Sequence, residues 1–536
     1  MRRPIQGGAK GFLSHYGSMH VRLKKNRTGS ISVIVVDKSS GRYKELHTVG
    51  IAKDESEVAL LRQKGLEWIR RRELEMHPEL DLYGEERRGC ESEMEMTERV
   101  VSNIDNILIN GAELILDRVF ERIGFNRIED DVFRKLVQSR LSFPASKAAT
   151  VEYLKNYYDE DLDLSKIYLY LDKLNDRHRH LVQDISVRHT MQVLGGHIDV
   201  MFYDVTTLYF ETDRQDELRK TGFSKEGRHS NPQVILGLLV SLGGYPLAYC
   251  IHEGNKYEGH TMLPVIREFV GKYQLDDFIV VADSGLMNKA NINDLEAEGC
   301  KYIIGSRIKN ESEEVKRQIL SLGKEDGMTH GIDKDGGRRL LIGYSDRRAG
   351  KDAHNREKGI HRLEKASKAG HLSKENVNRR GYNKFLDMDG STTVSINYDR
   401  IQEDARWDGL KGYLTNTDIP TEDVVSAYHN LWNVEKAFRI AKSKIEIRPM
   451  FHFTRRRIEA HVCICFVALK VYKGLERLLK LSGIKMSVDK VLNMAKTVTT
   501  ISVYMPQNKK HLTKTMPMKR HKPIAKLFEE EFWEAQ

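Results

Sequence analysis

Residues 200–207 read Val-Met-Phe-Tyr-Asp-Val-Thr-Thr, and the fold is best approached from this stretch. Its first four residues are apolar or aromatic and do not alternate with polar ones, which is typical of a strand buried on both faces of a sheet. Asp204 closes the run, so its carboxylate is predicted near the end of a buried strand, where an unpaired charge is costly to desolvate. The stretch predicts an α/β fold with a cation close to Asp204.

A second stretch repeats this arrangement. Residues 281–285 read Val-Ala-Asp-Ser-Gly, so Asp283 also follows an apolar run and precedes small turn residues. Either aspartate alone could simply end a strand and open a turn, but the matched pair favours a shared site. If the two strands are neighbours, both carboxylates lie at one edge of the sheet and repel each other unless cations neutralise them. Divalent magnesium, which prefers carboxylate oxygens, is the natural counter-ion.

The apolar runs around these two stretches have a definite order. Strands are predicted at 200–203, 234–240, 247–251, 278–282 and 302–304, and helices at 261–273 and 291–298. Three strands, a helix, a strand, a helix and a strand follow one another as in an RNase H-like sheet sandwiched by helices.

The rest of the chain is predicted to divide around this core. A small antiparallel meander is expected at 20–52, a helix at 55–75, a polar linker at 78–96, and strands at 340–343, 392–396 and 412–415. Residues 346–384 form a basic helical excursion with twelve Lys or Arg against five Asp or Glu. The six expected regions are a basic N-terminal β meander plus helix (1–95), a helical domain that could bind DNA (96–195), the first part of the RNase H-like core (196–308), an inserted β-rich subdomain (309–418), the second part of the core (419–480) and a basic helical tail (481–536).

Composition narrows the class of protein. The 536 residues are too many for one compact core, and we expect two to four structural units. The net charge of +10, from 87 basic and 77 acidic residues, favours a polyanionic partner such as nucleic acid or an acidic membrane surface, although many soluble proteins carry as much. Because no apolar stretch approaches the roughly 18 residues that span a bilayer, we expect a cytoplasmic protein.

The cysteines do not indicate a metal site. The chain has five, and none forms the C-x2-C pair of a zinc site. Cys463 and Cys465 lie in the apolar run 462–469, so core packing is a better interpretation than metal ligation.

A third candidate acid lies on a helix predicted to begin at Thr421. On one continuous helix, Tyr428, Leu431, Glu435 and Lys442 would fall within about 60° of the surface. Because this face would carry aromatic, apolar, acidic and basic side chains together, it is typical neither of a buried apolar face nor of an ordinary solvent-exposed one. The alternative is an amphipathic edge with ordinary pairing of Glu435 and the residue four positions later, an arginine.

The spacing of these four residues resembles the Tyr-Arg-Glu-Lys signature of bacterial insertion-sequence transposases of the DDE type. Residues 203–207 and 282–285 resemble the two Asp motifs of the same family, and the long insertion after Asp283 agrees with it. The similarity extends to the basic segment 21–26 and to segment 447–461, so it spans most of the chain in order. The signature Arg is Leu431 here, and Arg439 or Lys436 could contact phosphate in its place.

The resemblance implies a reaction and its partners. Asp204, Asp283 and Glu435 would hold two Mg²⁺ ions, with Mn²⁺ as a substitute, about 4 Å apart, as in two-metal phosphoryl transfer. Tyr428 and Lys442 would contact phosphates near the end of the element. The protein would cleave the terminal inverted repeats of double-stranded DNA and join them to target DNA as a homodimer, associated with the bacterial nucleoid when bound.

Other classes remain to be separated from this one. An RNase H-like nuclease without strand transfer would carry the same acids, and an inactive DNA-binding relative would have lost one or more of them. A phosphatase with an aspartyl nucleophile would need a second Asp where Thr206 stands, so that class is disfavoured.

Overall fold

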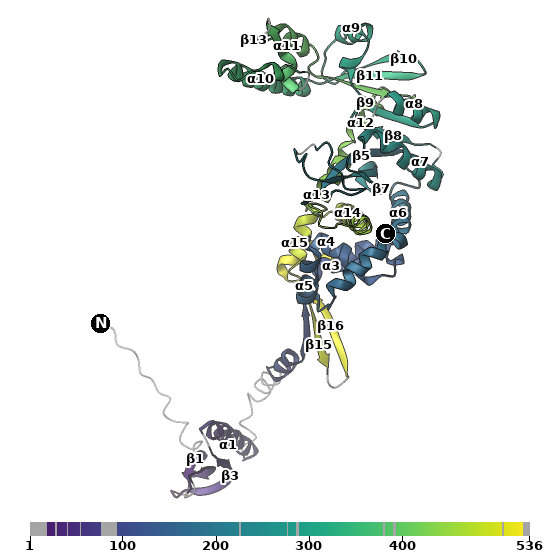
Figure 1. Cartoon of the computed structure of the whole chain (residues 1–536). Coiled ribbons are helices and arrows are strands. Elements are labelled where there is room, and N and C mark those ends of the chain that lie inside the picture. Colours follow the sequence, from purple (N-terminus) through teal and green to yellow (C-terminus); the bar gives the residue numbers. More distant parts are fainter. Residues whose placement is uncertain are drawn as a thin grey trace, which may run out of the picture. The chain divides into compact units, whose positions relative to one another are not determined.

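The structure is a computed structural model that describes residues 19–26, 29–39, 41–53, 55–76, 94–224, 227–275, 277–285, 289–378, 381–389, 393–505 and 509–528 (Figure 1). The chain divides into two compact units, Met1–Asp105 with Val503–Leu512, and Asn106–Ser502 with Thr513–Gln536. No helix among the described residues is long and apolar enough to cross a membrane.

The first unit contains a small antiparallel sheet and a helix. Strands β1 (Met19–Lys25), β2 (Ile31–Asp37) and β3 (Lys44–Ala52) pair in that order, and α1 (Glu55–Met76) follows. Helix α1 comes close to the sheet at Gly65, where an added Cβ would lie 2.9 Å from Val21 Cγ2. The predicted meander and helix are confirmed, whereas most of the predicted linker lies outside the described residues.

Four helices begin the second unit, where helical spacing was predicted. They are α3 (Gly111–Ile123), α4 (Asp131–Ser142), α5 (Lys147–Tyr158) and α6 (Leu164–Val193). Asp130, Ser146 and Asp163 cap the last three by accepting hydrogen bonds from backbone N–H groups of the first turn. Gly124 ends α3 with a φ of 96°, a left-handed conformation that favours glycine.

The ends of this region differ from the prediction. Residues expected to be helical include β4 (Ile104–Leu108), and the expected helical tail contains β15 (Thr499–Met505) and β16 (Lys510–Met516) beside α15 (Val488–Ala495). The three strands form a sheet in the order β16-β15-β4. Exposed and half-buried residues alternate along β4, but five residues are too few for this period to stand out in a sequence.

The large mixed sheet has the predicted order of elements. Strands β5, β6 and β7 are followed by α7 (Met262–Tyr273), β8, α8 (Lys289–Ala297) and β9. Strands β5 to β7 are antiparallel, while β8 pairs in parallel with β5 and β9 in parallel with β8. The five strands span Val200–Tyr209, Gln233–Ser241, Pro246–Glu253, Ile279–Ala282 and Lys301–Ser306.

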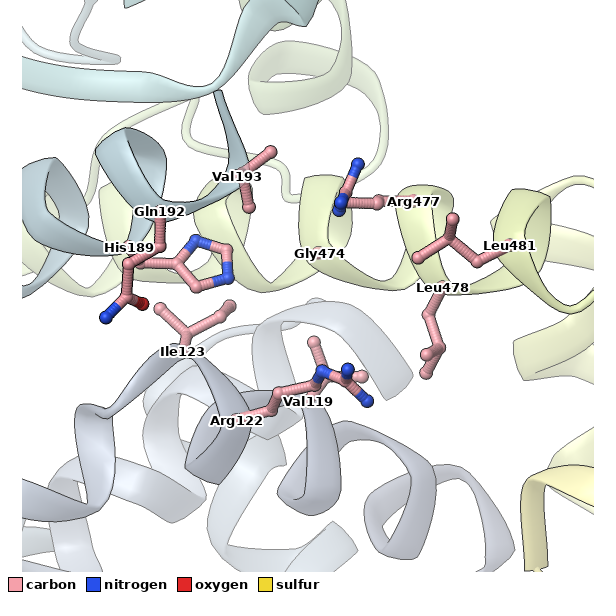
Figure 2. Close-up of a pocket in the computed structure, with 10 residues that line it drawn as sticks. All are labelled: Val119, Arg122, Ile123, His189, Gln192, Val193, Gly474, Arg477, Leu478 and Leu481. Atoms are coloured by element: carbon pink, nitrogen blue, oxygen red, sulfur yellow. The ribbon is translucent and has the colours of Figure 1, made fainter. Parts of the chain in front are cut away.

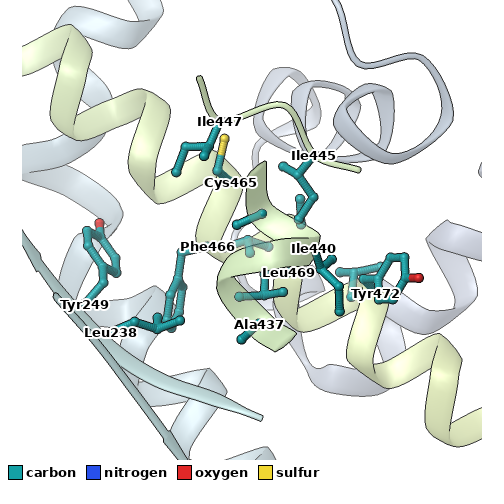
Figure 3. Close-up of a cluster of buried hydrophobic side chains, with 14 of the residues drawn as sticks. Leu238, Tyr249, Ala437, Ile440, Ile445, Ile447, Cys465, Phe466, Leu469 and Tyr472 are labelled. Atoms are coloured by element: carbon teal, nitrogen blue, oxygen red, sulfur yellow. The ribbon is translucent and has the colours of Figure 1, made fainter. Parts of the chain in front are cut away.

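Helices cover both faces of this sheet. Phe202 and Leu238 point to the face packed by α13 (Trp432–Ser443) and α14 (Arg455–Leu481), whereas Tyr203 points to the face packed by α7 and α8. Figure 3 shows Phe466 of α14 against Leu238, with Ala437 and Ile440 of α13 close by. Burial on both faces explains why these runs lack alternation.

The thiols of α14 belong to this core. Cys463 and Cys465 are 0% and 1% exposed, which confirms core packing as their role. Helix α14 as a whole lies at the centre of the largest hydrophobic cluster, so the apolar run of 462–481 closes the core.

The predicted inserted β-rich subdomain is not a separate sheet. Strands β10 (Thr329–Lys334), β11 (Arg338–Tyr344) and β14 (Leu410–Thr415) continue the core sheet beyond β9, in the order β10-β11-β14-β9. The hairpin β12 (Leu386–Asp389) and β13 (Thr393–Ile396) forms a sheet of its own. The insertion also contains the helices α9 (Glu313–Ser321), α10 (Asp346–Lys368) and α11 (Tyr398–Ala405).

The single helix predicted from Thr421 is wrong, because the structure has two. Helix α12 (Thr421–His429) ends before α13 begins. The N–H groups of Leu431, Asn433 and Val434 each bond to the carbonyl three residues earlier, which tightens the chain between the helices. The Asn430 side chain also donates to the Ser426 carbonyl at 3.0 Å. Tyr428 and Glu435 therefore do not share one continuous helix face.

Candidate active site

The two aspartates lie at the same level of neighbouring strands, Asp204 within β5 and Asp283 directly after β8. In the parallel pair β5 and β8, Tyr203 is the partner of Ala282, and the next residues are Asp204 and Asp283. Asp204 is half-buried and accepts a hydrogen bond from the Val205 N–H at 2.8 Å, while Asp283 is exposed. The prediction that the two aspartates follow neighbouring paired residues is confirmed, but the predicted strand end at Asp204 is wrong, because β5 continues to Tyr209 and stays paired with β6.

Tyr428 of α12 holds the second aspartate. Its hydroxyl donates to Asp283 Oδ1 at 3.0 Å, and the side chain is only 4% exposed. Burial raises the pKa of Tyr428 well above its usual range, and the charge of Asp283 raises it further, so the hydroxyl remains a donor. We predicted a phosphate contact for this residue, but the structure directs its hydroxyl to Asp283.

A glycine makes room for this contact. Gly305 of β9 lies beneath the tyrosine, and an added Cβ would come within 2.5 Å of Tyr428 Oη. The ring of Tyr413, on β14, packs edge-on against the ring of Tyr428, and the two ring centres lie 4.9 Å apart. The sheet and α12 thus fix the position of the hydroxyl that faces Asp283.

Lys411 is a site residue that sequence reasoning missed. Its Nζ lies 4.2 Å from the centre of the Tyr428 ring. Burial lowers the pKa of Lys411 and the charge of Arg348 lowers it further, while Asp283 and Glu435 raise it. Both acids therefore act on one ammonium group, although they are far apart in sequence. No sequence signal distinguishes this lysine from other strand lysines, because only the pairing of β14 with β9 brings it here.

Glu435 reaches the site from a different element. It is exposed in the first turn of α13, where the helix dipole favours a carboxylate, and α13 packs against β5. Glu435 and Arg439, both within the described chain, form no ion pair with each other. The proposed amphipathic-edge pairing is therefore not what this helix shows.

The three acids are not gathered into one metal-binding group. Among the residues that the structure describes, no three His, Cys, Asp or Glu side chains are arranged to hold a metal ion. The paired Asp204 and Asp283, with Glu435 acting on the same lysine as Asp283, nevertheless offer only oxygen donors. Such a donor set suits a hard divalent cation.

The predicted phosphate-contacting residues of α13 differ in their surroundings. Lys436 is half-buried and its Nζ lies 2.6 Å from Glu476 Oε1, so it serves an internal ion pair. Arg439 is exposed and Lys442 is half-buried. Leu431, at the signature Arg position, is 7% exposed and packs into the core, so it faces no DNA.

A basic groove adjoins Lys411. It has a volume of about 580 Å³ and is lined by α10, β11 and β14. Among its described lining residues the one acid is Asp326, which accepts a hydrogen bond from the Asp346 N–H at 2.9 Å. The cations that line it are Arg347, Arg348, Lys351 and Lys411. A groove of this charge is suited to a polyanionic strand.

A family comparison agrees with this geometry. The profile of the transposase DDE domain matches residues 195–470, which is more than half of the chain and includes every strand of the large sheet. This chain belongs to the DDE transposase family. Transposases of this family use divalent metal ions and act on DNA.

Two further comparisons add little to the family match. A solved structure, the cryo-EM structure of the piggyBac transposase synaptic complex with hairpin DNA, is similar at 9% identity with a TM-score of 0.38, covering 74% of this transposase and 78% of that chain. No curated protein sequence matches this transposase.

Proposed function

We propose that this transposase cuts the ends of an insertion-sequence element and joins them to target DNA, with Asp204, Asp283 and Glu435 as the catalytic acids of an RNase H-like core. One observation carries the proposal. The partnership of Tyr203 with Ala282 supports it, because the residue after each is an aspartate and the strand residues before them are buried. Two acids at the same level of neighbouring buried strands are costly unless they have a use.

In this proposal the three acids would hold Mg²⁺, or Mn²⁺ in its place. When bound, the ions would supply activation of the attacking water or 3′-hydroxyl and charge stabilisation for the departing oxygen. Tyr428 positions the Asp283 carboxylate through its hydrogen bond. Lys411 balances the charge of Asp283 and Glu435.

DNA is held by the protein's own cations in the same scheme. Lys351 and Arg347 of the groove, together with exposed Arg439, would contact phosphates of the element's end or of the target. Lys442 contributes a further positive charge on α13. Cutting and joining two ends together requires two active sites, so we propose a homodimer as the working form.

The test is cleavage and joining by acid-deficient variants. Asp204→Asn, Asp283→Asn and Glu435→Gln should each lower Mg²⁺-dependent cleavage of the element's own ends by roughly 10³-fold or more, because several kcal/mol of charge stabilisation is lost. End binding should stay within about threefold of wild type, since no DNA-contacting cation is removed.

The matched control is Glu422→Gln, which removes an exposed carboxylate from the first turn of α12 and should leave cleavage unchanged. A pre-cleaved end tests joining separately. Cleavage without joining would reduce the protein to a nuclease, and near-normal cleavage by any of the three variants would remove that residue from the site.

A further inference from the structure

A second cavity lies in the helical part of the same unit. Its volume is about 410 Å³, and α3, α6 and α14 form its walls (Figure 2). The polar groups that line it are Arg122, His189, Gln192 and Arg477, and the rest of the wall is valine, isoleucine, leucine and Gly474. No acidic side chain lines it.

The two arginines of the cavity face no counter-charge. Neither Arg122 nor Arg477 forms an ion pair with any residue in the described part of the chain. Burial lowers the pKa of Arg122, and the charge of Arg477 lowers it further, so the two guanidinium groups act on each other. Two cations in mutual repulsion beside a cavity are stabilised by an anion placed between them.

The acid beside Arg477 in the sequence is already engaged. Glu476 precedes Arg477 on α14, and its Oε1 lies 2.6 Å from Lys436 Nζ while Oε2 contacts Lys473 Nζ. Arg477 also acts on the Tyr245 hydroxyl, which carries no charge at neutral pH. Buried Lys470 donates to the Ser186 carbonyl at 2.9 Å, and burial lowers its pKa well below the usual range. The charged side chains that line the cavity, Arg122 and Arg477, are both cationic.

A histidine in the wall has an unused hydrogen-bonding atom. His189 Nδ1 is buried and has no partner, and Figure 2 shows the ring projecting into the cavity beside Ile123. Burial lowers the pKa of His189 to about 3, helped by the charges of Lys470, Arg477 and Arg122. Because Nδ1 has almost no accessible surface, the neutral imidazole would donate to a ligand through an N–H at Nε2, and Gln192 offers an amide.

The floor of the cavity is rigid and apolar. Gly474 of α14 packs on α3, where an added Cβ would lie 2.9 Å from Val119 Cγ1. Leu478 and Leu481 continue this apolar surface along α14, as Figure 2 shows. A hydrated inorganic ion would leave that surface unused, whereas a ligand with an apolar body would cover it.

We propose that this cavity binds a small organic anion, in which a phosphate or carboxylate group is joined to an apolar body. The anionic group lies between Arg122 and Arg477 and accepts hydrogen bonds from Gln192 and His189. The apolar body lies against Val119, Leu478 and Leu481. This site is independent of the DNA-cutting function proposed above.

Calorimetric titration of the full chain tests the proposal with simple probes. Phenyl phosphate and benzoate carry both parts of the ligand, inorganic phosphate and acetate carry the respective heads alone, and phenol carries the body alone. We expect at least one of the two organic anions to bind at least about tenfold more tightly than the head or the body alone, because both contact types add. The stronger of the two identifies the head group.

Substitution of the cavity arginines tests whether the probes bind at this site. Arg122→Gln and Arg477→Gln should each weaken binding of the better probe about tenfold or more, as expected when one charge-assisted contact is lost. Arg118→Gln, which removes an exposed arginine one turn earlier on α3, should bind like wild type. Failure of both organic anions to bind at millimolar concentration, or equal affinity of all three variants, would overturn the proposal.

Discussion

At the scale of single residues, Tyr428 links α12 to the carboxylate that follows β8. We predict that Tyr428→Phe keeps the buried ring but removes the hydrogen bond to Asp283, lowering the cleavage rate about tenfold and the free energy of unfolding by about 1 kcal/mol. Because Asp283 becomes less fixed, the Mg²⁺ concentration for half-maximal cleavage should rise. A magnesium titration of cleavage measures this.

The control for this variant is Tyr413→Phe, since the Tyr413 ring packs against Tyr428 but its hydroxyl is not the group that bonds to Asp283. A purely structural role for the Tyr428 hydroxyl would lower thermal stability and leave the magnesium requirement where it was. That outcome would contradict the positioning role.

Removing the charge of Lys411 should have the opposite effect on the magnesium concentration that cleavage requires. Its ammonium group is felt by both Asp283 and Glu435, so it competes with any divalent cation bound there. We predict that Lys411→Gln lowers the half-saturating Mg²⁺ concentration about fivefold, the change expected from roughly 1 kcal/mol of repulsion between charges in a partly solvated site. Lys411→Arg keeps the charge and is the control. An unchanged or higher requirement in Lys411→Gln would mean that the lysine does not act on the metal.

At the scale of elements, the order of strands and helices in the core could be predicted from the sequence, because runs such as those of β5 and β6 lack alternation and are bounded by turn residues. The place of Asp283 after β8 could be predicted for the same reason, whereas β5 continues past Asp204 to Tyr209 because the residues after Asp204 also pair with β6. The break between α12 and α13 could not, since it depends on three tight backbone hydrogen bonds and on the Asn430 side chain rather than on glycine or proline.

The insertion was harder to interpret than the core. Residues 345–409, which include the 23 residues of α10 and also β12, β13 and α11, separate β11 from β14 in sequence, so nothing in the order of residues reveals that these strands pair with each other. The contribution of Lys411 follows from that pairing and from the pairing of β14 with β9. The pairing of strands far apart in the sequence therefore explains why neither the extended sheet nor the place of Lys411 could be predicted.

The contribution of Glu113, between α3 and α5, to the free energy of unfolding depends on pH. Burial raises the pKa of Glu113 to about 7, although Tyr153 donates a hydrogen bond to it at 3.0 Å. The folded state therefore holds a proton that the unfolded state releases near its ordinary value of 4.5. This contribution to stability is present below pH 4.5 and is lost as the pH rises to about 7.

Replacing Glu113 with a residue that does not titrate should abolish the loss of stability at high pH. We predict that Glu113→Gln, compared with wild type by urea unfolding, gains up to about 3 kcal/mol in relative stability between pH 4 and pH 8. Taking the difference between the two proteins cancels titrations that they share. A difference that does not change with pH would show that Glu113 ionises normally in the folded protein.

At the scale of the whole molecule, a net charge of +10 says little by itself, because its effect depends on where the cations gather. The groove beside Lys411 collects cations from the amino-terminal end of α10, whereas the rest of α10 carries its basic residues elsewhere. DNA bound for cutting should therefore depend on the first turns of this helix more than on its later ones.

The salt dependence of end binding distinguishes the cations in the first turns of α10 from those in its later turns. We predict that Arg347→Gln and Lys351→Gln each weaken binding and lower the slope of log affinity against log salt by about 1, because each releases about one fewer counter-ion. Lys358→Gln and Arg362→Gln, which remove exposed charges further along α10, should change the slope by much less. Equal slopes for the two pairs would mean that α10 acts only through its total charge, and the groove would then have no special part in holding the DNA that Asp204 and Asp283 are proposed to cut.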